Sequence, residues 1–154
     1  MKRADWAIVS WLSAAYLTGT AAAAATDAGV TPQRARSLYI LHCAGCHQID
    51  GSGTPAYGVP SMIDTLGQFE RTAAGRAFLV QVPGARNASV TDAELAAMTN
   101  WALRTFSAAT LPSDFKPYTA AEVTPLRANP PLDIAGARAA IVAALPAPTP
   151  RVAK

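Results

Sequence analysis

Two cysteines and a histidine stand together in the motif Cys-Ala-Gly-Cys-His at residues 43–47 of this 154-residue chain. Thiols three positions apart lie on one helical turn, where both can form thioether bonds with the two vinyl groups of one porphyrin. The histidine that follows the second cysteine is placed to ligate the iron through a ring nitrogen. The spacing therefore predicts one covalent haem c, attached through Cys43 and Cys46, with His47 as an axial iron ligand.

Three other roles for these residues match the sequence less well. His42 would complete a set of two cysteines and two histidines for zinc, but zinc sites normally draw two ligand pairs from separated segments. A thioredoxin-like pair would need a βαβ context, of which the sequence has no sign. A disulfide between Cys43 and Cys46 would close a very short loop and stabilise the fold little. Haem attachment is the preferred interpretation.

The first 25 residues have the features of an export signal. Lys2 and Arg3 form a short basic start, and residues 6–17 are mostly apolar but too short to span a bilayer comfortably. A run of alanines at residues 21–25 then fits an Ala-x-Ala cleavage site. We expect residues 1–25 to be a cleaved signal peptide; an uncleaved signal would hold the same domain at the membrane surface.

Cap and turn signals predict two helices in the first half of the exported chain. Thr31 as N-cap, followed by Pro32, begins a helix that runs into the haem motif. A middle helix is expected from Thr72 to Val82, ended by Pro83-Gly84. The apolar face of the first helix is expected to consist of Ala35, Leu38 and Leu41.

The clearest helix signal is the capping box that Thr91 forms with Glu94, in which each side chain satisfies a backbone amide of the other residue. A helix beginning there has apolar residues at helical spacing. The stripe consists of Leu95, Met98, Ala102 and Phe106, with Trp101 beside it.

The composition changes after Ala109, because eight of the twelve prolines follow it. We therefore divide the exported chain into a haem domain, residues 26–110, and a C-terminal arm and tail, residues 111–154. The arm is expected to be extended and packed on the domain, with a short alanine-rich helix at residues 133–145 and a disordered end from Pro146. The arm's apolar residues, spaced too irregularly for one helix, are Leu111, Phe115, Tyr118, Val123 and Leu126.

This order of motifs resembles the class I mono-haem c-type cytochromes over about residues 31–109. The resemblance rests on Tyr39-x-x-x-Cys43-x-x-Cys46-His47, Asp50-Gly51-x-Gly53 and Thr91-Asp92-x-Glu94-Leu95. It implies a small all-α domain that folds around its haem in the periplasm, with the first and last helices crossing. Ala35 and Tyr39 would then meet Trp101 at the crossing.

The resemblance also implies roles for residues around the haem. In the family a proline carbonyl accepts a hydrogen bond from the proximal imidazole, and an apolar residue two positions later touches the haem; Pro60 and Met62 match. The family's distal ligand is usually a methionine from the loop before the last helix, but residues 82–90 here contain neither methionine nor histidine. Met62 is the first candidate on chemical grounds, and an open or Asn87-guarded iron is the second. Met98 is expected in the core.

The family implies an electron-transfer protein and no enzyme. It would carry single electrons between a periplasmic dehydrogenase and a respiratory acceptor such as an oxidase. The alternative is a five-coordinate or asparagine-guarded haem protein that binds oxygen, nitric oxide or peroxide as a sensor or weak enzyme. With a formal net charge of +3 and no basic cluster, the sequence argues against nucleic-acid binding.

Overall fold

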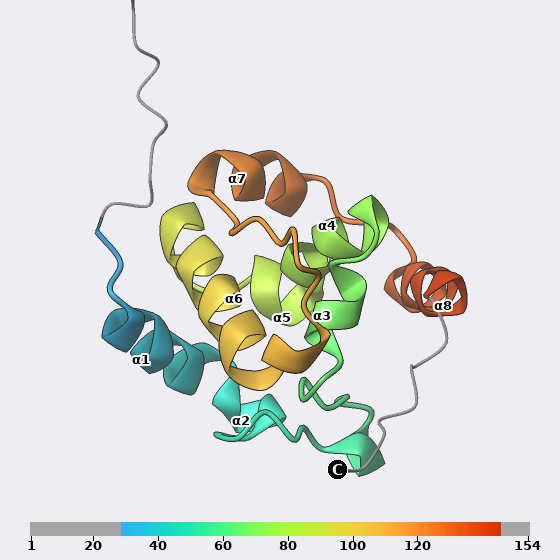
Figure 1. Cartoon of the computed structure of the whole chain (residues 1–154), viewed down its shortest axis with the longest axis horizontal. Helices are drawn as coiled ribbons and strands as arrows, with labels where there is room; N and C mark the ends of the chain where they lie inside the picture. Colours follow the sequence, from blue (N-terminus) through green and yellow to red (C-terminus); the bar gives the residue numbers. More distant parts are fainter. Residues whose placement is uncertain (1–28, 146–154) are drawn as a thin grey trace, which may run out of the picture.

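Helices make up the regular secondary structure of residues 29–145, the part of the chain that the computed structural model describes (Figure 1). Within it, a single isolated β-bridge pairs Thr54 with Val59. The all-α prediction is confirmed. The α-helices are α1 (Pro32–His42), α2 (Ala44–His47), α3 (Leu66–Phe69), α4 (Ala73–Gln81), α5 (Pro83–Arg86), α6 (Asp92–Phe106), α7 (Ala120–Ala128) and α8 (Ile134–Ala144); the 3₁₀ helices are η1 (Pro55–Tyr57) and η2 (Ala108–Thr110).

The two helices that pack most extensively, α1 and α6, begin where their cap signals predicted. The Thr31 hydroxyl accepts a hydrogen bond from the Arg34 amide, and Thr91 and Glu94 form the full capping box. The rings of Tyr39 and Trp101 lie 5.1 Å apart at the contact between the helices, as expected. Such aromatic pairs add to the stabilisation from buried area alone.

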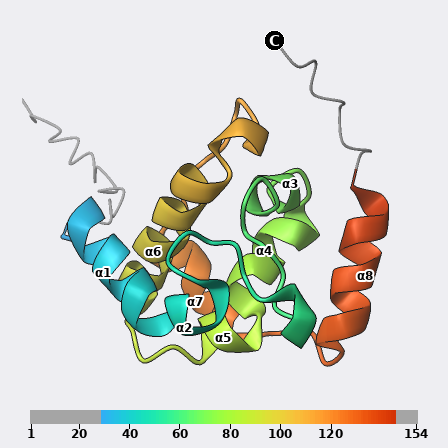
Figure 2. The same cartoon turned by 90° about the horizontal axis from the view of Figure 1, so that it is seen from below.

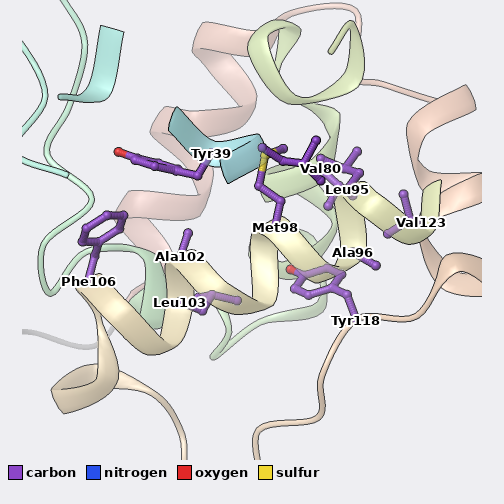
Figure 3. Packing of buried hydrophobic residues seen from close by; sticks show 11 residues of the cluster. Tyr39, Val80, Leu95, Ala96, Met98, Ala102, Leu103, Phe106, Tyr118 and Val123 are labelled. Carbon is purple, nitrogen blue, oxygen red and sulfur yellow. The ribbon is translucent and has the colours of Figure 1, made fainter. Parts of the chain in front are cut away.

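The apolar stripe of α6 faces the core as predicted, and the helix buries more than the stripe (Figure 3). The buried residues of α6 are Leu95, Ala96, Met98, Ala102, Leu103 and Phe106. On α1 the prediction is wrong for Leu41, which is 73 % exposed. Tyr39 takes the buried position instead, because it continues the helical face of Ala35 and Leu38 more closely than Leu41 does.

The middle helix α4 lies within the expected range of residues 72–82, with Thr72 as its N-cap and Val82 as its C-cap. Pro83 then begins the short helix α5, whereas the sequence pattern predicted only a stop there. Proline favours the first helical position because its missing N–H has no partner there in any case. The chain therefore leaves α4 at Val82 and begins a new helix, α5, at Pro83.

The expectation of an extended C-terminal arm is wrong for part of its length. Residues 111–119 have no helix, but α7 follows them, and α8 occupies almost the whole of the predicted alanine-rich helix. Tyr118 and Val123 are fully buried in the same core as α6. Thr119 caps α7 by accepting a hydrogen bond from the Glu122 amide, so the helix begins with the same Thr-x-x-Glu spacing as α6.

Helix α8 lies at the edge of the molecule, next to α4 (Figure 1). It forms a second apolar cluster in which Ile141 is buried with Phe69 and Phe78. No helix within residues 29–145 has the length and apolar character needed to cross a bilayer. The predicted signal peptide and the tail from Pro146 fall outside the described residues.

Candidate haem-attachment site

The two cysteines lie at the end of α1 and on the turn that follows it. Cys43 joins α1 to α2 and donates its backbone N–H to the Tyr39 carbonyl at 2.8 Å, and the His47 amide bonds back to the Cys43 carbonyl at 2.9 Å. Neither thiol is in a disulfide. Cys46 is exposed, whereas Cys43 is half-buried, and this burial raises the pKa of its thiol to about 11. The motif thus presents two free thiols on one helical turn.

The His47 imidazole is oriented from the loop that follows it. Its Nδ1 lies 3.3 Å from the Pro60 carbonyl oxygen. Since a carbonyl can only accept, the proton of the neutral ring belongs on Nδ1, and the lone pair on Nε2 is free to bind a metal. Burial lowers the pKa of His47, although the bond to Pro60 acts in the opposite direction, so the neutral form of the ring is favoured.

The Pro60 carbonyl reaches His47 because the intervening loop folds back onto the motif. The Gly53 amide bonds to the His47 carbonyl at 2.9 Å, and the Thr54 hydroxyl bonds to the Cys46 carbonyl at 3.2 Å. Gly53 has a φ of +71°, and a Cβ there would lie 2.5 Å from the Pro60 oxygen. Glycine is thus required for its backbone conformation and for the space beside the carbonyl that holds His47.

Met62 is anchored on the same side of the site as Pro60. Its backbone N–H bonds to the Gly51 carbonyl at 2.8 Å, and its carbonyl accepts a bond of 2.7 Å from the Ser107 hydroxyl. The side chain is half-buried against the main core. These bonds fix the backbone of Met62 two residues after the Pro60 carbonyl that contacts His47.

Met98 is in the core, as expected, and it also makes a contact that the sequence did not predict. Its sulfur lies 3.8 Å from the Cys43 sulfur, and the residue is 3 % exposed. Figure 3 shows it on α6 near Val80 and Leu95. The contact arises because the crossing of α1 and α6 brings the middle of α6 to the end of α1.

Asn87 and His42 are the other two residues predicted from the sequence to lie near the iron or the motif. Asn87 is the exposed C-cap of α5, and its backbone N–H bonds to the Pro83 carbonyl at 3.1 Å. His42 is the last residue of α1 and directly precedes the attachment motif.

No group of three or more cysteine, histidine or acidic side chains in residues 29–145 is arranged to hold a metal ion. The two cysteines and two histidines of the zinc interpretation therefore do not converge.

The donor set fits a covalently attached haem. Two unpaired thiols share a turn, and the adjacent imidazole is held through Nδ1 with Nε2 free. Large apolar side chains are unusually exposed in the segment around the motif, where an apolar porphyrin would need neighbours. They are Ile40, Leu41, Ile49, Tyr57 and Ile63.

Comparison of the chain with family models, with curated proteins and with solved structures gave no match.

Proposed function

We propose that this protein is an exported, periplasmic mono-haem c-type cytochrome that carries single electrons. The observation that carries the proposal is the hydrogen bond between His47 and Pro60 next to two free thiols on one turn. A metal-ligating histidine commonly gives its other ring nitrogen to a carbonyl, which fixes both the tautomer and the ring orientation. A class I cytochrome arrangement of the helices is part of the same proposal.

Each residue of the motif has a separate task in this function. Cys43 and Cys46 tether the cofactor through neutral thioether sulfurs, and His47 supplies a neutral imidazole. Bound haem supplies the one-electron couple of its iron. Pro60 keeps the imidazole from rotating, and the buried side chains of α6 exclude water behind Cys43.

The exposed apolar side chains around the motif support a protein redox partner where they extend beyond the bound porphyrin. Tyr57 is 87 % exposed, and Leu41 and Ile49 are 73 % and 67 % exposed. Aromatic and aliphatic side chains that are exposed near a redox group favour short-lived docking of another protein. A periplasmic dehydrogenase or a terminal oxidase fits this role, and membrane association is expected only if the signal is not cleaved.

Covalent attachment is the first experimental test. Expression with a haem-attachment system should give a polypeptide that keeps its haem stain in denaturing electrophoresis, with one haem per chain. Cys43→Ala and Cys46→Ala should each lower the yield of holoprotein, and Cys46→Ala should disturb packing less because Cys46 is exposed. Haem that extracts completely into acidified organic solvent would refute the proposal.

A second candidate function, the binding of a small ligand at the iron, is favoured by the positions of the methionines. The backbone of Met62 is tied to Gly51 and Ser107, close to Pro60, and Met98 sits against Cys43, which would hold the porphyrin. The absorption spectrum separates the two functions. A methionine charge-transfer band and no reaction with carbon monoxide favour electron transfer, whereas a high-spin spectrum with rapid carbon monoxide binding favours ligand binding.

A further inference from the structure

The loop between α5 and α6 is held by one side chain from the C-terminal part of the chain. Nε of Arg127, on α7, bonds to the Arg86 carbonyl at 2.7 Å, and Nη1 bonds to the Val90 carbonyl at 2.8 Å. Nη2 bonds to the Ala88 carbonyl, and Nη1 also meets the Asp92 carboxylate at 2.9 Å. A single guanidinium therefore joins three loop carbonyls to the first residue of α6.

This loop connects two walls of the core that contains the attachment cysteine. Val80 on α4 and Leu95 on α6 belong to the same apolar cluster as Met98, whose sulfur touches Cys43. The loop itself contributes Val90 to that cluster, and α5 contributes Ala85. In Figure 2 the chain runs from α5 to α6 along the side of the molecule that also carries α2. The loop thus joins two helices whose side chains pack in one cluster with Met98, and Met98 contacts the attachment cysteine.

The loop has few other means of staying in place. Its internal hydrogen bonds are short-range turns, such as that from the Val90 amide to the Ala88 carbonyl. Charge-assisted bonds from a planar guanidinium are stronger than neutral ones and impose a geometry, because the donors form a rigid fork. The Arg127 side chain is only 19 % exposed, which strengthens these bonds relative to a surface contact.

We propose that Arg127 is a positioning residue that fixes the Arg86–Asp92 loop as a wall of the haem site, so that the C-terminal segment controls access to the iron. The proposal rests on the proposed haem function. Loss of the guanidinium would free the loop carbonyls and allow the wall to open, although Arg127 touches neither the motif nor the haem-attachment thiols.

The test compares Arg127→Met and Arg127→Lys with Thr124→Val in the haem-loaded protein. Methionine keeps the aliphatic stem without the donors, and lysine keeps the charge without the fork. The control, Thr124→Val, removes a different contact between α7 and α6, the 2.6 Å bond from the Thr124 hydroxyl to Asp92. It leaves the bonds from Arg127 to the loop carbonyls in place. If Arg127→Met does not fold, Arg127→Lys still tests the fork.

Two measurements are expected to change together in the Arg127 variants. Amide hydrogen exchange at residues 87–90 should become at least about tenfold faster, because charge-assisted bonds that oppose local opening are lost. Ferrous haem should also combine with carbon monoxide faster than in the wild type and in Thr124→Val. An unchanged carbon monoxide rate would overturn the proposal, as would faster exchange spread evenly over all helices. A wild-type protein without covalent haem would instead contradict the proposed function.

Discussion

The Tyr39 hydroxyl donates a 2.6 Å hydrogen bond to the carbonyl of Gln48, the residue directly after His47. Tyr39 is 1 % exposed, and Gln48 has a φ of +63°, which is uncommon for a residue with a side chain. This bond joins α1 to the point where the chain leaves the motif. Tyr39 thus links the aromatic core between α1 and α6 to the backbone directly after His47.

Removal of the hydroxyl by Tyr39→Phe should lower the free energy of unfolding by about 1–3 kcal/mol, because the Gln48 carbonyl loses its partner beside a buried ring. Urea denaturation of the holoprotein measures this loss. The ring contacts with Trp101 and Phe106 should persist, so the near-ultraviolet circular dichroism should stay close to that of the wild type. A variant as stable as the wild type would show that the bond contributes nothing.

Gly53→Ala should be more damaging than Gly58→Ala. Both glycines have φ values near +70° to +80°, but a Cβ at Gly53 would lie 2.5 Å from the Pro60 oxygen, whereas one at Gly58 would meet nothing within 4 Å. Backbone strain is thus common to both variants, and only Gly53→Ala displaces the carbonyl that holds His47. We expect a lower yield of holoprotein and a shifted reduction potential for Gly53→Ala alone. Equal effects in both variants would contradict the clash.

Met62→Leu separates packing from iron ligation at this residue. Leucine keeps a similar volume, and such exchanges usually cost less than about 1.5 kcal/mol of stability. Because the backbone bonds of Met62 hold it close to Pro60, we expect the ligand spectrum to stay unchanged. Met98→Leu applies the same test of iron ligation to the other methionine. Loss of a methionine band, with gain of carbon monoxide binding, in Met62→Leu alone would establish Met62 as the distal ligand.

Asp92 should make the protein sensitive to acid. The hydroxyl of Thr124, and then the guanidinium of Arg127, hold the pKa of this carboxyl below its ordinary value of 3.8. A lowered folded-state pKa stabilises the fold fully above the ordinary value, and the stabilisation is lost as pH falls through the folded-state value. The denaturation midpoints of the wild type and Asp92→Asn should therefore differ at pH 7 and converge as the pH falls below 3.8 and through the folded-state pKa. A stability difference independent of pH would assign the effect to hydrogen bonding alone.

Tyr118→Ala should detach the C-terminal segment from the core. Tyr118 is fully buried, and its hydroxyl bonds to Glu70 and to the Arg76 carbonyl, each at 2.6 Å. Truncation of a large buried aromatic ring typically costs about 3–5 kcal/mol. Limited proteolysis with mass spectrometry should find new cleavage within residues 111–126, a segment that we expect to stay intact in the wild type. The exposed Lys116 provides the control, since Lys116→Ala should leave the pattern unchanged.

Local signals in the sequence determined much of the secondary structure. Thr31 and Thr91 each predicted a helix start because an N-cap hydroxyl satisfies a backbone amide within three residues, whatever the rest of the fold does. Thr119 carries the same signal, but the prolines after Ala109 and the irregular apolar spacing of the segment predicted an extended arm instead. Proline weakens a helix without forbidding it when the core holds that helix in place.

The attachment motif could also be identified from the sequence alone, because Cys43, Cys46 and His47 are neighbours in the chain and their chemistry depends on that spacing. The contact of Met98 with Cys43 and the four bonds of Arg127 were decided only by the tertiary structure. These partners are 35 to 55 residues apart in sequence. Such contacts depend on how α6 crosses α1 and where α7 docks, and both follow from burial summed over the whole core, which no local pattern encodes.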